Sequence, residues 1–392
     1  MRILMFFSSR IDFLPPLLTA AASMAGLGAT VHVVASGSSR ESADYLQRHG
    51  VEVLTERDGE HPKTYFGRAI LRAQVGVGLI RHVRSIRPDC LWYHGPFAME
   101  YSFLPGVTGE AVIVAHAYEL CDRDFFLRQV MDTTLRRADI VIVPEINRLW
   151  MLRVRSRSRA RFFEIPNRHL EEGVAGTESG QRTRQIFLDN GGSAACSRFL
   201  IYQGAFMGGR CLREVVQAFR GVKNDDVGLI LLGGGLAGDL TQELIGLAQM
   251  DGRVVVVNRM PPPTHLAVTR GCIAGILLYA PLDLNNVYCA PNKIYEYAAA
   301  GLGMILPDYP GVALLGRTYA LGELCDPENV QSIRAAMERV LIRDPNDYRR
   351  AAARFLQSTP RPEEMYRDVY EEIFARIGQR RRDGAGLKSR KD

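Results

Sequence analysis

Ala290-Pro291-Asn292-Lys293-Ile294-Tyr295-Glu296-Tyr297-Ala298-Ala299-Ala300-Gly301 lies between two short apolar runs, residues 273–278 and 303–306. Both runs have the length of buried strands, so we expect the quoted segment to supply the helix that connects them. Lys293 stands three residues before Glu296, about one helical turn, and near the expected helix N-terminus, where anions are favoured. A strand–helix–strand connection of this kind predicts a parallel sheet.

The same alternation runs through the second half of the chain. Further strands are expected at residues 199–202, 228–232 and 254–257, and helices at residues 212–219, 329–343, 346–357 and 363–377. Glycine-rich turns follow two of these strands, at residues 208–209 and 233–235, as a strand that turns tightly into a helix requires. Residues 314–320 are expected to pack irregularly.

The first half repeats this organisation. Strands are expected at residues 2–7, 30–34, 51–54, 90–93, 111–115, 139–143 and 164–167, and helices at residues 14–27 and 40–49. The chain is therefore predicted to be an α/β protein of two parallel-sheet domains in tandem, with ligands bound at the carboxyl ends of the strands in the cleft between them.

Domain boundaries follow from the same pattern. We expect an N-terminal domain over residues 1–167, a polar linker or first segment of the second domain over 168–197, and a second domain over 198–357. A C-terminal helix over 358–378 is expected to pack back on the N-terminal domain, and a basic disordered tail to occupy 379–392.

Composition narrows the class of protein. The chain has 392 residues, of which 47% are hydrophobic and 23% charged, as in folded proteins of two domains. The net charge of +6 favours anionic partners, but no nucleic-acid-binding module is recognisable, so we expect no nucleic acid. The seven cysteines are scattered and odd in number, which fits a reducing cytoplasm and argues against a disulfide framework or a zinc site. No export signal or spanning segment is apparent, so the protein is expected to be cytoplasmic, at most peripheral to a membrane.

Three stretches together resemble the C-terminal domain of the GT-B glycosyltransferases of family 4, the retaining "group 1" transferases. They are the segment quoted above, residues 202–212 (YQGAFMGGRCL) and residues 231–235 (LLGGG); the string P-N-K-x-x-E-Y-x-x-x-G is the most specific. The resemblance implies two Rossmann-like domains facing a cleft, and transfer of a sugar from a nucleotide-diphosphate donor, UDP- or GDP-linked, to a hydroxyl acceptor with retention. It also implies no metal and no other cofactor, and the sequence contains no cluster of residues with metal-ligand spacing.

The resemblance assigns the donor site to the second half. Glu296 corresponds to the family's glutamate that grips the ribose, and a carboxylate can accept both hydrogen bonds of a vicinal diol. Lys293 is expected at the diphosphate or in support of the site. Arg210 opens a helix after a glycine turn, where a cation and free backbone N–H groups form a phosphate cradle. The alternatives are ordinary surface ion pairs for Glu296 and Arg210 and a solvated side chain for Lys293.

The sequence departs from the family pattern at two positions. The first of the family's paired glutamates is Tyr288 here, and the first of its two basic residues falls near the uncharged Ala205 and Phe206. We expect the donor sugar to be contacted by Tyr288, Cys289, Asn286 and Asn292, through backbone N–H groups and neutral amides. The nucleotide is expected to be contacted, besides Glu296, by Gly235, Asn258 and Arg259.

Polar residues at strand ends of the first half are the acceptor-side candidates. His116 and Glu119 follow one strand and are predicted to face the cleft as catalytic residues, and His94, Arg10 and Asp12 follow two others as acceptor contacts. A lone histidine is also a common structural residue. The basic, partly apolar stretch 148–161 is interpreted as a solvated helix and loop, with an anionic membrane surface as the alternative.

Two other functions stay open. A sugar-nucleotide epimerase could share the architecture, but the missing first glutamate weakens this interpretation, and no motif indicates a phosphorylase. A non-catalytic nucleotide-sugar-binding partner of another transferase is the second alternative. A dehydrogenase is disfavoured because Ser8-Ser9-Arg10, not G-x-G-x-x-G, follows the first strand.

Overall fold

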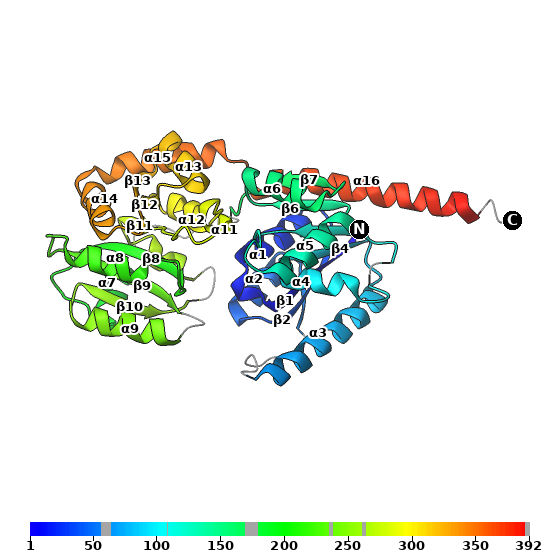
Figure 1. The fold of residues 1–392 in the computed structure, drawn as a ribbon, viewed down its shortest axis with the longest axis horizontal. Helices are drawn as coiled ribbons and strands as arrows, with labels where there is room; N and C mark the ends of the chain where they lie inside the picture. The colour runs from blue at the N-terminus through cyan, green and yellow to red at the C-terminus, as the bar shows by residue number, and fades with distance from the viewer. Residues whose placement is uncertain (56–63, 108, 169–178, 235–237, 261–263, 389–392) are drawn as a thin grey trace. The chain divides into compact units, whose positions relative to one another are not determined.

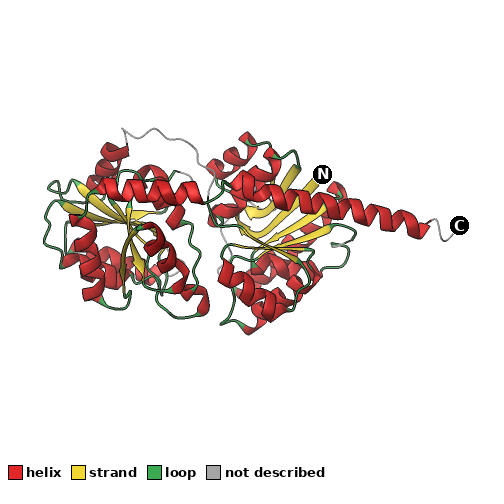
Figure 2. Ribbon diagram, turned by 90° about the horizontal axis from the view of Figure 1, so that it is seen from above, coloured by secondary structure: helices red, strands yellow, loops and turns green. Residues whose placement is uncertain are grey.

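The protein consists of two compact units, one formed by Met1–Leu170 with Arg361–Asp392 and the other by Glu171–Pro360. The computed structural model describes residues 1–55, 64–107, 109–168, 179–234, 238–260 and 264–388, without the side chains of Phe13, Tyr65, Arg68 and 383–388. Each unit is a parallel sheet with helices on both faces (Figures 1 and 2).

In the described part of the first unit, seven parallel strands run in the order β3-β2-β1-β4-β5-β6-β7. Their bounds are β1 (Arg2–Arg10), β2 (Thr30–Gly37), β3 (Glu52–Thr55), β4 (Cys90–His94), β5 (Val112–His116), β6 (Ile140–Val143) and β7 (Arg161–Glu164). The central strands are apolar on both sides, as expected for a sheet covered on both faces.

One face of this sheet packs on α1 (Pro15–Gly26), α2 (Arg40–Arg48) and α16 (Pro362–Lys388). The other packs on α3 (Tyr65–Ile86), α4 (Pro96–Met99), the short 3-10 helix η2 (Glu100–Phe103), α5 (Phe125–Arg137) and α6 (Ile146–Ser156). A further 3-10 turn, η1 (Ile11–Phe13), follows β1.

In the second unit, the described strands run in the order β10-β9-β8-β11-β12-β13, again all parallel. Their bounds are β8 (Arg198–Ala205), β9 (Val227–Gly234), β10 (Val254–Asn258), β11 (Ala274–Ile276), β12 (Gly303–Pro307) and β13 (Gly322–Cys325). The helices are α7 (Ser179–Asp189), α8 (Leu212–Arg220), α9 (Gly238–Gln249), α10 (Leu266–Thr269), α11 (Leu284–Val287), α12 (Lys293–Ala299), α13 (Pro310–Tyr319), α14 (Val330–Ile342) and α15 (Pro345–Ser358). Phe187 of α7 is fully buried in the core of this unit, so residues 179–189 belong to the second unit. Of the two alternatives for residues 168–197, this part of the segment fits the first segment of the second domain.

Helix α16 returns to the first unit, where Tyr366, Val369 and Ile373 enter its core. The helix continues through residues 379–388, so the disordered tail expected from residue 379 is wrong for this segment. The Arg380 guanidinium explains the continuation, since it donates to both carboxylate oxygens of Asp139 at 2.8 and 2.7 Å. The end of α16 extends past the other elements of this unit (Figure 1).

Candidate functional site

The carboxyl edge of the second sheet contains the point where strand order reverses. The chain fills β8, β9 and β10 outward in one direction and then begins β11 on the other side of β8. The connections after β8 and β11 therefore leave the sheet in opposite directions and open a crevice, which is the usual ligand site of such sheets.

Two glycines shape the backbone at this edge. Gly204, near the end of β8, has φ +134°, and a Cβ placed on it would lie 3.0 Å from Cε and 3.2 Å from Nζ of Lys293. Gly233, its partner in β9, leaves even less room for a side chain, because a Cβ on Gly233 would lie 1.9 Å from the carbonyl oxygen of Gly204. The absence of side chains allows the Lys293 chain to lie directly against the β8 backbone.

Lys293 and Arg210 are each placed over a tyrosine ring. The Lys293 ammonium lies 4.2 Å from the ring centre of Tyr202 and 5.7 Å from that of Tyr279, while the Arg210 guanidinium lies 4.0 Å from that of Tyr279. Tyr202 is on β8, and Tyr279 follows β11 across the crevice. The two cations predicted from sequence are thus brought together, and the two rings that support them are residues to which sequence analysis assigned no role.

The environment of Lys293 makes its charge responsive to a ligand. Burial and the neighbouring positive charge of Arg210 lower the pKa of Lys293 to about 7, although the carboxylate of Glu296 opposes the change. An anion placed between the two cations removes part of this penalty. The arrangement is therefore suited to hold a group with two or more negative charges.

Glu296 lies one turn along α12 and takes part in a buried polar network. Gln203 donates through Nε2 to one carboxylate oxygen of Glu296, and the Thr269 hydroxyl donates to the side-chain oxygen Oε1 of Gln203. His265 Nε2 lies 3.6 Å from the other carboxylate oxygen. The Glu296 side chain is only 6% exposed, so the carboxylate is held in one orientation, and the sequence alternative of a surface salt bridge is wrong.

The expected donor-sugar residues cluster around the short helix α11. Asn286 donates to the carbonyl of Ala280 at 3.0 Å and so braces the chain after β11. Tyr288 directly follows α11, Cys289 is buried, and Asn292 directly precedes α12. A Cβ on Gly311 of α13 would lie 2.7 Å from the Cys289 nitrogen, so α13 packs directly on this backbone.

Two of the residues expected to contact the nucleotide, Asn258 and Arg259, are exposed at the end of β10. Asn258 ends β10 beside Gly233, and Arg259 follows it. Gly235 lies outside the described residues. Contact of these three residues with a nucleotide stays a prediction.

In the first unit, His94 and His116 end adjacent strands and share one hydroxyl. The Tyr118 oxygen lies 2.8 Å from His94 Nδ1 and 3.0 Å from His116 Nδ1. The imidazoles are 0% and 1% exposed, and burial lowers the pKa of His94 to about 3 and that of His116 well below its usual value. Within the described structure, neither Nε2 atom has a hydrogen-bond partner.

This geometry differs from the sequence expectation for His116 and Glu119. His116 was expected to face a cleft, but it lies beneath the surface, because Trp92 stacks on His94 and Tyr366 of α16 packs on Trp92. Glu119 is exposed and takes no part in the histidine cluster.

Arg10 and Asp12 are brought together at the end of β1. Asp12 accepts hydrogen bonds from Arg10 Nη2 at 2.9 Å and from the Ser39 backbone nitrogen at 2.8 Å. Burial opposes ionisation, but these hydrogen bonds and the Arg10 charge hold the pKa of Asp12 below its usual value. The pair forms a fixed, ionised corner at the carboxyl edge of the first sheet.

Several arginines of the basic stretch 148–161 bind the protein itself. Arg148 is buried and donates to the carbonyl of Tyr118, while Arg155 pairs with Asp132 at 2.9 Å and Arg161 pairs with Glu372 at 2.5 Å. Arg153 lies over the rings of Trp150 and Phe162. Most of the charge that suggested a membrane surface is therefore engaged within the first unit.

The described residues include no group of three or more His, Cys, Asp or Glu side chains that could hold a metal ion. Over the same residues, none of the helices combines the length and the apolar character needed to cross a membrane.

Comparison with known proteins identifies the fold class. No protein-family model and no curated protein matches the chain. HepE of Anabaena, solved in complex with UDP and glucose, is similar over 96% of this chain and 100% of its own, with a TM-score of 0.72 and 14% identity. WaaG, a glycosyltransferase involved in lipopolysaccharide biosynthesis, is similar over 95% and 99%, with a TM-score of 0.65 and 13% identity.

A protein assigned as a UDP-N-acetylglucosamine 2-epimerase of Listeria monocytogenes is similar over 90% of each chain, with a TM-score of 0.58 and 13% identity. Likeness at such identities defines architecture. The protein has the GT-B fold, two Rossmann-like α/β units of seven and six described parallel strands, and the crevice at the β8–β11 switch point is the candidate functional site.

Proposed function

We propose that this protein is a retaining, metal-independent glycosyltransferase that moves a sugar from a nucleotide-diphosphate donor to a hydroxyl acceptor. The observation that carries the proposal is the pair of cations at the switch point of the second sheet, Lys293 over Tyr202 and Arg210 over Tyr279. A diphosphate fits this pair in charge and position. HepE, which has the same fold, was solved with UDP and with UDP-glucose, and this supports a UDP-sugar as the first donor to test.

In the proposed reaction the bond between the sugar C1 and the diphosphate oxygen breaks, and a bond from the acceptor oxygen to C1 forms on the same face. The acceptor proton passes to the departing diphosphate. Negative charge grows on the diphosphate as the C1–O bond breaks, and Lys293 and Arg210 stabilise it where it develops. This stabilisation requires no metal ion.

Glu296 is proposed to accept hydrogen bonds from the two ribose hydroxyls. Gln203 and His265 fix its carboxylate in advance, which reduces the entropy lost on binding. Around the sugar, Tyr288, Cys289, Asn286 and Asn292 are proposed to provide backbone and amide contacts. Asn258 and Arg259 are proposed to contact the base.

The first unit is proposed to bring the acceptor, a sugar, a lipid-linked sugar or another small molecule with a hydroxyl group. Arg10 and Asp12 form a preorganised charged corner at the edge of the sheet. His94, His116 and Glu119 remain candidates for this side, with the two imidazoles acting from beneath the surface. We propose the cytoplasm as the site of the reaction, because nucleotide sugars are made there.

Calorimetry with UDP, GDP and their glucose and mannose conjugates tests the donor site. Wild type is compared with Glu296→Ala, Lys293→Met and, as a matched control on the surface of the same unit, Glu338→Ala. Selective binding of one nucleotide that is lost in the first two variants and kept in the third is expected. Binding unaffected by Glu296→Ala and Lys293→Met would remove the site from this crevice.

The likeness to the Listeria protein keeps an epimerase as the second candidate. Product analysis by NMR separates the possibilities once the donor is known. A transferase releases free nucleotide diphosphate and joins the sugar to a hydroxyl with the donor's anomeric configuration. An epimerase changes the sugar without net consumption of the nucleotide sugar, and a non-catalytic partner binds the donor and changes nothing.

A further inference from the structure

Helix α3 contains no aspartate or glutamate in its 22 residues and carries four arginines. It is apolar on two sides. Val75 and Leu79 on its inner side are buried in the first unit's core, and Gly76 allows it to approach Leu104 and Tyr101 of the neighbouring segment. Packing of the inner side therefore explains why α3 lies where it does, but it does not explain the apolar residues on the outer side.

The outer side presents apolar and cationic residues in one stripe. Successive residues of a helix turn by about 100°, so positions 66, 70, 77, 81 and 84 fall within about 60° of one another. Phe66, Ile70 and Val77 in this stripe are 75%, 42% and 60% exposed. We call Phe66, Ile70, Val77, Arg81 and Arg84 the α3 stripe.

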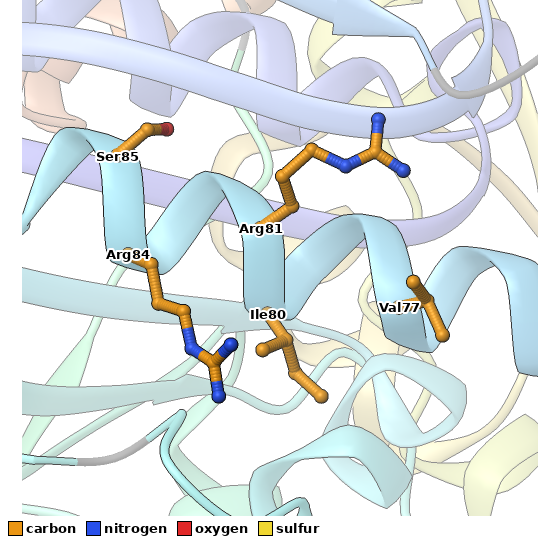
Figure 3. A pocket seen from close by; sticks show the side chains of 5 residues that line it. All are labelled: Val77, Ile80, Arg81, Arg84 and Ser85. Atoms are coloured by element: carbon orange, nitrogen blue, oxygen red, sulfur yellow. The ribbon is translucent and has the colours of Figure 1, made fainter.

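A depression of about 450 Å³ lies at the C-terminal half of the stripe, lined by Val77, Ile80, Arg81, Arg84 and Ser85. The Arg81 and Arg84 side chains start from neighbouring positions on this face and extend in opposite directions across it, and the apolar side chains of Val77 and Ile80 lie alongside (Figure 3). Neither arginine forms an ion pair or hydrogen bond with the described residues. The depression thus combines an apolar floor with two uncompensated cations.

Among the residues that the structure describes around α3, none neutralises Arg81 or Arg84. Arg72, on another side of the helix, lies near Glu100. Burial raises the pKa of Glu100, and the positive charge of Arg72 offsets only part of this increase. Beside α3, η2 exposes Phe103 with the Arg137 guanidinium 5.3 Å from its ring centre, another pairing of an apolar surface with a cation. This contrasts with α6, where Arg148 and Arg155 are engaged internally.

From this pattern we propose that the α3 stripe binds the surface of an anionic phospholipid bilayer, with α3 lying in the plane of the interface. Arg81 and Arg84 contact lipid phosphates, and Ile70, Val77 and Phe66 enter the headgroup boundary. Exposed aliphatic and aromatic side chains beside cations fit a lipid interface better than a nucleic acid, whose surface offers phosphates without an apolar layer. The inference is independent of the proposed donor site, which lies in the other unit.

Flotation of the full-length protein with phosphatidylcholine vesicles, with and without one quarter phosphatidylglycerol, tests the inference. The variants are Arg81→Gln/Arg84→Gln, Ile70→Ser/Val77→Ser and the matched control Arg182→Gln/Arg354→Gln. The control removes the same charge from two exposed arginines of the second unit that form no ion pair or hydrogen bond within the described part of the chain. Circular dichroism and nucleotide binding report that each variant is folded.

Binding only to the anionic vesicles is expected. Each cation near such a surface contributes about 1 kcal/mol, so the double arginine variant should bind about 30-fold more weakly, and the control close to wild type. The serine variant should also lose vesicle binding. Equal binding to both vesicle types, or an equal loss in the control, would overturn the inference.

Two further results would also overturn it. An unchanged serine variant that also binds single-stranded DNA would assign the stripe to polyanions, since no apolar insertion would then be involved. Dimers in sedimentation velocity that the serine variant abolishes would assign it to a second copy of the chain.

Discussion

Binding of a nucleotide sugar beside Lys293 should take up a proton. Burial and the Arg210 charge lower the pKa of Lys293 to about 7 in the free protein, whereas an ordinary lysine has a pKa of about 10.4. The diphosphate of a nucleotide sugar carries two charges that do not titrate near neutral pH. We expect it to restore the pKa of Lys293 toward the ordinary value, because the protonated amine then faces an anion.

The sign and size of the effect follow from this shift. Below about pH 6 the free lysine is already charged and affinity is at its maximum. Binding should weaken about fivefold from pH 7 to 8 and about tenfold from pH 8 to 9. Between about pH 7 and 9 the Kd should rise about 50-fold, equal to about 2.3 kcal/mol. Uptake should reach about 0.9 proton per donor near pH 8.

Calorimetry in HEPES and Tris, whose ionisation enthalpies differ, measures both quantities directly. Lys293→Arg carries a charge that does not titrate in this range, so its affinity should be nearly independent of pH. Lys293→Met should bind weakly at every pH. A wild-type Kd that is constant from about pH 7 to 9, or the same pH dependence in Lys293→Met, would refute the reasoning.

Substitutions at three other positions have expected outcomes. Tyr279→Leu removes the ring under Arg210 and should weaken donor binding about 2- to 30-fold by calorimetry, because a cation over an aromatic face is stabilised by about 0.5–2 kcal/mol. Tyr279→Phe keeps the ring and should keep wild-type affinity. Equal losses of affinity in the two variants would contradict this role of the ring. Gly233→Ala should destabilise the second unit by about 3 kcal/mol in urea unfolding, because its Cβ would overlap the Gly204 carbonyl oxygen. An unchanged unfolding midpoint would show that this edge of the sheet adjusts freely. Val369→Ala leaves a cavity under α16 and should cost about 1–3 kcal/mol in the first unit, while the Kd for donor should not change; a weaker donor Kd would show that α16 also supports the donor site.

The strand–helix alternation was predictable wherever a segment has one dominant pattern. The β-branched run after Ala29 predicted β2, and the helices over 329–343 and 346–357 agree with α14 and α15 within a residue or two. α3 was not predicted, because apolar residues on both of its sides obscure the helical period. The expectation of irregular structure at 314–320 was wrong, because α13 covers residues 310–319. Gly311 lowers the helix propensity of this segment, but its lack of a side chain allows α13 to pack on the backbone at Cys289.

The site was predictable only in part, for a related reason. Motif spacing identified Arg210, Lys293 and Glu296, and the structure brings the first two together over tyrosine rings. Tyr202 and Tyr279 look like ordinary core residues in sequence, and only the crossover that places β11 beside β8 makes them neighbours. The burial of His116 could not be predicted either, because Trp92 beside the cluster is packed by Tyr366, a residue of the last helix of the chain.

The hydroxyl shared by His94 and His116 determines whether each Nε2 atom is a hydrogen-bond donor or an acceptor. Each neutral imidazole carries one N–H, and Tyr118 has a single proton to place between the two Nδ1 atoms. When Tyr118 donates its proton to the Nδ1 atom of one ring, it accepts a hydrogen bond from the Nδ1–H of the other ring. The two rings must then be opposite tautomers. One Nε2 is then a donor and the other an acceptor. These two polarities would exchange only if one proton entered at the acceptor Nε2 and one left from the donor Nε2. At the same time, the Nδ1 proton of one ring would pass to the Tyr118 oxygen, and the Tyr118 proton would pass to the other Nδ1. Such a relay would carry one proton between the two Nε2 atoms without moving a heavy atom or changing the net charge.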